Sequence, residues 1–298
     1  MLGVLAGADP RIDETFKEAS RILGWDLLRL VREGPESELN RTQRTQPALL
    51  AASVAVWRAW RAGEPPQPAL LAGHSLGEYT ALVAAGSIDF GDALKLVELR
   101  GRLMQEAVPE GEGLMAAVLG ADDAAVEKLC SEYPGPGVLE PANYNSPGQV
   151  VVAGSRVALD WLTAGAKTIG ARRVLPLPMS VPSHCSLMRM AAARLGERLM
   201  QVDVRAPTVP VLHNIDAAPH PDPAAIRDAL IGQLHHPVRW SQTVRTMAGQ
   251  GIEAFLECGP GRVLTNLGKR ILDGGQFVGL EDPDGMSQGL ALLKGAAA

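Results

Sequence analysis

The stretch Ala69-Leu70-Leu71-Ala72-Gly73-His74-Ser75-Leu76-Gly77-Glu78-Tyr79-Thr80-Ala81 decides how the rest of the chain is interpreted. It contains a short apolar run, a G-x-S-x-G motif and an Ala/Leu-rich segment, an order typical of strand, sharp turn and helix. We expect Gly73 and Gly77 to be required, because a Cβ at either position would crowd the packing of strand against helix. Ser75 would then sit in strained geometry near a helix N-terminus, where negative charge is favoured. The alternative is a glycine-rich turn with a surface serine.

The composition of the chain narrows its class. Its 298 residues allow one large domain or two smaller ones, and a hydrophobic content of 46% with a net charge of -5 gives no reason to expect nucleic acid. The apolar stretches are too short to span a bilayer, and residues 1–6 lack the basic flank of a signal peptide. Three scattered cysteines without metal-ligand spacing indicate a reducing compartment. We therefore expect a cytoplasmic protein.

Strands and helices alternate along the chain, which predicts an α/β fold with a mostly parallel sheet. Between residues 111 and 177 the pattern is strand, helix, two strands, helix, strand. This βαββαβ order is that of a ferredoxin-like domain. We therefore predict a large discontinuous domain, residues 1–110 and 182–298, with a small inserted domain, residues 111–181.

The sequence also predicts one helix and three strands of the large domain. A helix is expected to start at Pro47, in its first turn, and to run to Arg61. Strands are expected at Val209–Leu212, Ile252–Glu257 and Phe277–Leu280.

A serine nucleophile needs a general base, and six histidines are available. His184 stands where the chain returns from the small domain, so it can lean over a nucleophile; the alternative is a half-buried histidine bonded to backbone. His74 adjoins Ser75, but neighbouring side chains at such a turn usually diverge, and the other four histidines are expected to be structural or exposed. No acid is an obvious third member. Asp216 is a candidate, and a main-chain carbonyl can also orient the base.

Two more features have both a functional and a plain interpretation. Arg100 lies in a long amphipathic helix; facing a cleft, its guanidinium could grip a substrate carboxylate, whereas an arginine on a solvated helix face is the commoner case. The amide-rich run of residues 143–149 is either part of a site or ordinary turn chemistry.

Taken together, these segments resemble the bacterial malonyl-CoA:acyl carrier protein transacylases of fatty acid synthesis, from about Met1 to about Leu280. The motifs that carry the resemblance occur in the family's order: Gly73-His74-Ser75-Leu76-Gly77-Glu78, Arg100, Asn143-Tyr144-Asn145-Ser146-Pro147-Gly148-Gln149, Val181-Pro182-Ser183-His184 and Glu257-Cys258-Gly259-Pro260-Gly261.

The resemblance implies a role for each matching residue. Ser75 would carry malonyl as an ester, His184 would be its base, and the main-chain carbonyl of Gln233 would orient His184. Arg100 would hold the malonyl carboxylate and the Leu76 N–H would donate to the oxyanion. The remaining candidate substrate-binding residues are His74, Asn143 and Asn145.

The resemblance also implies partners and fold. Malonyl would pass from malonyl-CoA to Ser75 and then to the phosphopantetheine thiol of acyl carrier protein, in ping-pong order, without a metal or redox cofactor. The large domain would be hydrolase-like, and the protein would be a monomer that binds neither membrane nor nucleic acid.

The chain departs from the family at its front. Family members begin with a strand and a Phe-Pro-Gly-Gln-Gly-Ser-Gln loop, and Met1-Leu2 aligns just downstream of both. The family's loop glutamine supplies the second oxyanion N–H, and loss of one such donor costs about 100–1000-fold in rate. We expect that Met1 is a misplaced start, and that the chain as given has a gap beside the Ser75 strand and weak activity.

Three alternatives remain open at this point. The chain could be a serine hydrolase or thioesterase of related fold, a catalytically poor protein that only binds acyl carrier protein, or an acyltransferase of polyketide synthesis or malonate decarboxylation. Arg100 discriminates the first of these, because a malonyl transferase needs the cation and a general esterase does not. Arg100→Ala should therefore sharply reduce malonyl transfer.

Overall fold

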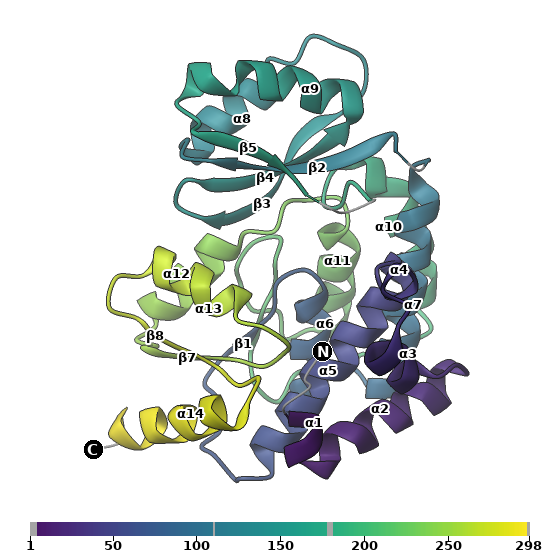
Figure 1. Cartoon of the computed structure of the whole chain (residues 1–298), viewed down its shortest axis with the longest axis vertical. Coiled ribbons are helices and arrows are strands. Elements are labelled where there is room, and N and C mark those ends of the chain that lie inside the picture. Colours follow the sequence, from purple (N-terminus) through teal and green to yellow (C-terminus); the bar gives the residue numbers. More distant parts are fainter. Residues whose placement is uncertain (1–4, 110, 178–180, 297–298) are drawn as a thin grey trace.

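The computed structural model describes residues 5–109, 111–177 and 181–296 (Figure 1). The N-terminal part is helical, and α2, α6 and α7 pack against the long helix α5. The bounds are α1 (Leu5–Ala8), α2 (Pro10–Leu23), α3 (Leu27–Glu33), α4 (Glu36–Leu39), α5 (Thr42–Arg61), α6 (Leu76–Ala84) and α7 (Phe90–Ala107). The expectation about Met1-Leu2 and the segment before it lies outside the described residues.

Helix α5 corrects the predicted position of Pro47. The helix begins at Thr42, so the proline lies inside it. An interior proline removes one backbone hydrogen bond and costs about 3 kcal/mol. Leu50, Val54 and Trp60 are among the side chains that α5 buries, and each such burial stabilises by roughly 1.5–3 kcal/mol. Packing therefore outweighs the proline penalty, and the prediction was wrong because it applied the local rule alone.

The predicted parallel strands are present as two parallel pairs. β1 (Leu71–Ala72) pairs with β6 (Val211–Leu212), and β7 (Ala254–Glu257) pairs with β8 (Gln276–Gly279). The strands are shorter than expected or begin at a different residue. Helices surround them, with bounds α10 (Arg189–Leu199), α11 (Pro223–Gln233), α12 (Trp240–Gly249), α13 (Val263–Ile271) and α14 (Pro283–Ala296); a 3-10 turn, η2 (Ser186–Met188), precedes α10.

The segment between α7 and η2 forms the ferredoxin-like unit. Its elements follow the predicted βαββαβ order: β2 (Gly113–Leu119), α8 (Asp123–Ser131), β3 (Leu139–Ser146), β4 (Gln149–Ser155), α9 (Arg156–Gly165), η1 (Ala166–Ile169) and β5 (Arg173–Pro176). The four strands form one antiparallel sheet in the order β3-β4-β2-β5. The α/β fold class with this added sheet is confirmed. The domain boundaries remain a prediction, and residues 110 and 178–180 beside them are outside the described part.

The two faces of this antiparallel sheet pack against different partners. One face, with Val118 and Val152, packs under α8 and α9, which lie on the side turned away from the rest of the molecule (Figure 1). The other face carries Met115 and Val151, in one apolar cluster with Cys185. A second junction joins β3 to the segment before α12, where the Tyr144 N–H donates to the Val238 carbonyl at 2.9 Å and the Val238 N–H donates to the Ala142 carbonyl at 2.9 Å. In the described part of the chain, no helix combines the length and apolarity needed to cross a membrane.

Candidate active site

Ser75 lies at the sharp turn between β1 and α6. Its φ of 51° and ψ of -108° place a non-glycine residue in a sparsely populated backbone region, which costs of order 1–3 kcal/mol. Gly73 is required as predicted, because a Cβ there would overlap the backbone of Gly77. The steric prediction for Gly77 is wrong, since a Cβ at that position would meet no atom within 4 Å. Leu76 begins α6, whose first N–H groups have no acceptor within the helix.

Hydrogen bonds from distant segments hold the strained turn. The Ser75 N–H donates to Asn214 Oδ1 at 2.7 Å, and Asn214 Nδ2 donates to the Gly73 carbonyl at 2.7 Å. Gln233 Nε2 donates to the Ser75 carbonyl at 2.9 Å. The turn is therefore fixed from both sides, by the loop after β6 and by the end of α11.

His184 faces the Ser75 hydroxyl. Its Nε2 lies 2.8 Å from Ser75 Oγ, and its Nδ1 lies 2.7 Å from the Gln233 carbonyl oxygen. Because a carbonyl can only accept, Nδ1 carries the proton and Nε2 is free to accept one from the serine. Burial, and secondarily the charge of Arg100, lower the pKa of His184 to about 3. The imidazole is thus neutral, as a general base must be.

Asp216 is not part of this arrangement. Its carboxylate pairs with His220 Nε2 at 2.9 Å, four residues further along the chain. The partner of His184 Nδ1, for which Asp216 is a candidate from sequence, is the Gln233 carbonyl. The reason is topological: Asp216 follows β6 on a loop that turns back to its own histidine, whereas the end of α11 reaches His184.

Arg100 lies inside the site and not on a solvated helix face. Its side chain is 1% exposed. Nη1 donates to Gln46 Oε1 at 2.7 Å, and Nη2 donates to Gln233 Oε1 at 3.0 Å and to Ser75 Oγ at 3.2 Å. All three acceptors are neutral. Burial lowers the pKa of Arg100, but a guanidinium stays charged in proteins, so a buried cation lies beside Ser75.

Glu78, in the first turn of α6, connects the residues behind Ser75. It is fully buried. Its Oε1 lies 2.7 Å from His213 Nδ1, and its Oε2 accepts from the Asn214 N–H at 3.0 Å and from Gln233 Nε2 at 2.8 Å. The same carboxyl group therefore anchors both segments that hold Ser75.

The remaining candidate residues lie at the junction with the antiparallel sheet. His74 Nε2 is 2.8 Å from Asn145 Oδ1, the His74 ring packs against Trp240, and burial lowers the pKa of His74. Asn143 is buried and forms a bridge with Val238. Both asparagines belong to β3, so the interpretation as simple turn residues is wrong for them.

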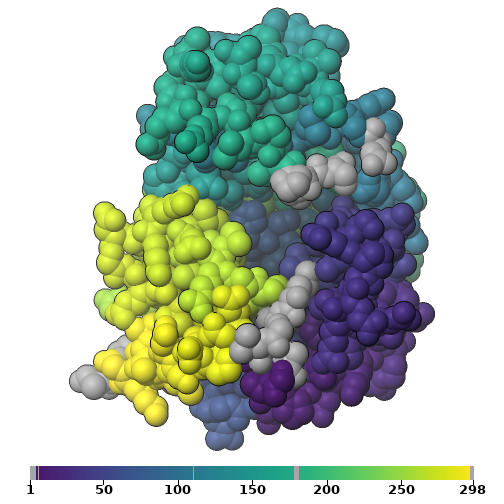
Figure 2. Space-filling model, viewed as in Figure 1, coloured from purple at the N-terminus to yellow at the C-terminus, as the bar shows by residue number. Residues whose placement is uncertain are grey.

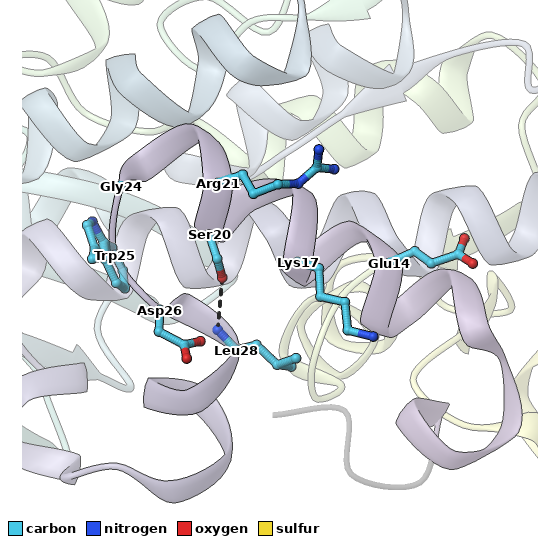
Figure 3. Close-up of a pocket in the computed structure, with 8 residues that line it drawn as sticks. All are labelled: Glu14, Lys17, Ser20, Arg21, Gly24, Trp25, Asp26 and Leu28. Carbon is cyan, nitrogen blue, oxygen red and sulfur yellow. Dashed lines mark hydrogen bonds between the residues drawn. The ribbon is translucent and has the colours of Figure 1, made fainter.

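Figure 2 shows the surface around this region: the segment coloured blue is recessed between the purple N-terminal part and the yellow C-terminal part, beneath the teal sheet. Two open pockets lie along α2. The larger, about 850 Å³, is lined by Lys17, Arg21 and Trp25 among others (Figure 3), and neither is lined by a residue of the candidate site. Over residues 5–109, 111–177 and 181–296, no three or more His, Cys, Asp or Glu side chains are grouped so as to hold a metal ion.

Sequence reasoning missed Gln46, Glu78 and Asn214. Glu78 carried the clearest signal, because an acidic residue stands just after G-x-S-x-G within an apolar segment. Nothing in the sequence marks Gln46 except its position beside Pro47. Asn214 stands in a loop, and its partner Ser75 is 139 residues away in sequence.

Comparisons with known proteins place this geometry in a family. The sequence pattern of the family described as "Acyl transferase domain" matches residues 4–281. The chain is 53% identical over 290 residues to the malonyl CoA-acyl carrier protein transacylase of Salmonella typhimurium, covering 97% of this chain and 94% of the relative. It is 52% identical over 292 residues to the protein of that name from Escherichia coli, covering 98% of this chain and 94% of the relative.

Solved structures agree with these relatives. An acyl carrier protein S-malonyltransferase from Vibrio cholerae superposes with a TM-score of 0.94 at 51% identity, covering 97% of this chain and 94% of that one. A malonyl-transacylase in complex with a type II PKS acyl-carrier protein superposes with a TM-score of 0.96 at 49% identity, covering 98% of this chain and 94% of that one.

Proposed function

This chain belongs to the acyl transferase domain family, and from that membership we propose that it transfers malonyl from malonyl-CoA to the phosphopantetheine thiol of acyl carrier protein, in fatty acid biosynthesis. The observation that carries the residue assignment is the position of Ser75 Oγ, 2.8 Å from His184 Nε2 and 3.2 Å from Arg100 Nη2. A neutral base and a buried cation thus meet at one hydroxyl. An ester-forming serine selective for an anionic acyl group requires both.

In the first half-reaction, His184 Nε2 takes the hydroxyl proton as Ser75 Oγ attacks the thioester carbonyl of malonyl-CoA. The tetrahedral oxyanion accepts a hydrogen bond from the Leu76 N–H at the start of α6. When the intermediate collapses, the carbon–sulfur bond breaks, and the coenzyme A sulfur leaves with the proton that His184 holds. The products are coenzyme A and malonyl-Ser75.

In the second half-reaction the same groups act in reverse. His184 takes the thiol proton of the carrier's phosphopantetheine, and the sulfur attacks the malonyl-Ser75 ester. Collapse breaks the carbon–oxygen bond and returns the proton to Ser75 Oγ. Both steps exchange an acyl group between a hydroxyl and a thiol without a change of oxidation state, so we propose that no metal or redox cofactor takes part.

Arg100 would bind the free carboxylate of the malonyl group. Its present partners are two amide oxygens and a hydroxyl, so a carboxylate would be its first charged acceptor and would be held bidentately. His74 and Asn145 would line the acyl site from the sheet side, and Asn143 would fix β3 beneath them. We also propose a cytoplasmic location, which the three unpaired cysteines support.

Intact mass spectrometry after brief exposure to malonyl-CoA tests the proposal. We expect the mass of one malonyl group on the wild-type chain and none on Ser75→Ala. Addition of holo acyl carrier protein should remove the adduct and yield malonyl carrier. An adduct that decays equally fast without the carrier would identify a hydrolase instead, and retention of the adduct by Ser75→Ala would refute the assignment of the nucleophile.

A further inference from the structure

The side-chain amide of Gln233 lies at the centre of the buried site, in addition to the main-chain carbonyl that orients His184. Gln233 is the last residue of α11 and is fully buried. Its Nε2 donates to Glu78 Oε2 at 2.8 Å and to the Ser75 carbonyl at 2.9 Å, and its Oε1 accepts from Arg100 Nη2 at 3.0 Å. One amide therefore contacts the turn, the buried acid and the buried cation.

Glu78 fixes the direction of this amide. Its Oε2 accepts from the Asn214 main-chain N–H and from Gln233 Nε2, and the Ser75 carbonyl can only accept. A flipped amide would set its oxygen against these two acceptors and its NH₂ against the Arg100 guanidinium. Only the present orientation satisfies all three neighbours, so Gln233 Oε1 faces Arg100 as a consequence of the Glu78 position.

The amide in turn fixes Arg100. Gln46 Oε1 holds Nη1 at 2.7 Å and Gln233 Oε1 holds Nη2, so the two terminal nitrogens of the guanidinium are each tied to one amide oxygen. A planar guanidinium whose two terminal nitrogens are both hydrogen-bonded can present its remaining N–H groups in one direction only. A bidentate carboxylate contact requires that direction to be correct.

We propose that Gln233, oriented by Glu78, is a positioning residue whose side chain aims Arg100 at the carboxylate of the acyl group, so that preference for a malonyl over an uncharged acyl group depends on it. This inference rests on the proposed function, in which Arg100 binds that carboxylate. It assigns to the Gln233 side chain a task separate from that of its main-chain carbonyl.

The test measures a ratio in each variant: kcat/KM for malonyl transfer from malonyl-CoA, divided by the rate at which p-nitrophenyl acetate acetylates Ser75. The ester lacks a carboxylate, so a general loss of Ser75 or His184 reactivity cancels in the ratio. Gln233→Met keeps the main-chain carbonyl and the approximate volume but removes the amide. We expect its ratio to fall roughly 10- to 100-fold, mainly through KM, as for the loss of a hydrogen bond to a charged group.

Two further variants separate positioning from mere structural support. Asn214→Ala removes a support of the Ser75 turn and only the longest contact of Gln233 Nε2, at 3.4 Å, while Glu78 and the Ser75 carbonyl still hold the amide. Both rates should therefore fall together, and the ratio should stay near the wild-type value. Glu78→Gln can keep an acceptor oxygen toward Gln233 and the Asn214 N–H, so it should lower the ratio much less than Glu78→Met does.

Glu78→Met completes a double-mutant cycle with Gln233→Met. Glu78 has a direct electrostatic effect on Arg100 and, in addition, orients the Gln233 amide that contacts it. Glu78→Met should therefore lower the ratio clearly more in the wild-type background than in the Gln233→Met background. The proposal would be overturned if Glu78→Met and Gln233→Met lowered the ratio independently, so that the double variant shows the product of the two effects. A Gln233→Met ratio equal to that of the wild type would also overturn it. If Glu78→Met shows no cooperative thermal unfolding, Gln233→Met alone decides. A wild-type chain that is never malonylated would instead refute the proposed function.

Discussion

At the residue scale, the proposed contact of Arg100 with the malonyl carboxylate is the feature that would separate a malonyl transferase from a general esterase. Arg100→Met fills a similar volume without any N–H donor, and leaves the substrate carboxylate buried without a partner. Truncating one side of such a pair costs about 2–5 kcal/mol, so we expect kcat/KM for malonyl-CoA to fall roughly 30- to 5000-fold. Acetylation of Ser75 by p-nitrophenyl acetate should fall far less. Equal losses with both acyl donors would contradict the role of Arg100 in binding the carboxylate.

The lowered pKa of His184 predicts how kcat/KM depends on pH. It is lowered to about 3 by burial and by the charge of Arg100, whereas an ordinary histidine titrates near 6.5. The neutral imidazole therefore persists as the pH falls through 6.5, and kcat/KM reports the free enzyme. We expect kcat/KM for malonyl-CoA, measured by the release of coenzyme A, to begin to fall with acid only well below pH 6.5. Measurement from about pH 5 to pH 8 tests this, and an acid limb at or above 6.5 would refute it.

The same shift has a consequence for stability. Below pH 6.5 the unfolded chain binds a proton at this histidine while the folded chain does not, so the folded state loses stability as the pH falls. Acid should therefore lower the free energy of unfolding before it protonates His184 in the folded chain, which urea titrations at pH 7 and pH 5 would measure.

The chemistry of single residues was the most predictable part of the site. Ser75 and His184 each stand in a short motif, Arg100 was indicated only by the family resemblance, and the three meet around one hydroxyl. Their supports were not predictable, because Glu78 and Asn214 are bonded across 136 residues and Arg100 and Gln46 across 54. The local sequence does not show which residues will pair when they are so far apart along the chain.

At the element scale, the turn between β1 and α6 offers two glycines with opposite requirements. Gly73→Ala would drive a methyl group into the Gly77 backbone, so it should destabilise the fold by more than about 1 kcal/mol and abolish Ser75 acylation. Gly77→Ala meets no atom and lies in a helix, so it should stabilise by roughly 0.5–1 kcal/mol with acylation retained. Urea unfolding and the rate of malonyl-Ser75 formation measure both. Equal behaviour of the two variants would show that the turn tolerates a Cβ at Gly73.

Element type was easier to predict than element limits. The order βαββαβ follows from hydrophobic alternation and glycine-rich turns, and the sheet has it. The start of α5 and the lengths of the parallel strands depend on tertiary packing, which overrode Pro47 and left β1 and β6 with two residues each.

At the scale of the whole molecule, the site depends on how the antiparallel sheet meets the rest of the chain. Ser75 and His184 are 109 residues apart in sequence, and most of that interval builds the sheet. The chain leaves α7, forms the sheet and returns at Val181, so the position of His184 is set where the two parts touch (Figure 1). Sequence alone predicts that two parts exist, but the contact between them depends on side chains from both.

Two neighbouring valines of β4 test whether this junction positions His184. Val151 lies in the apolar cluster that includes Cys185, and Val152 lies on the opposite face under α8 and α9. Each Val→Ala change removes the same buried groups, so both should reduce the free energy of unfolding by roughly 1.5–3 kcal/mol in urea titrations. Only Val151→Ala removes packing from the cluster that contains Cys185, the residue that follows His184. It alone should therefore slow malonylation of Ser75, measured under conditions where both variants are fully folded. If the two variants acylate at the same rate, packing at the junction stabilises the fold without positioning the base, and the hydrogen bond to the Gln233 carbonyl is sufficient to hold His184.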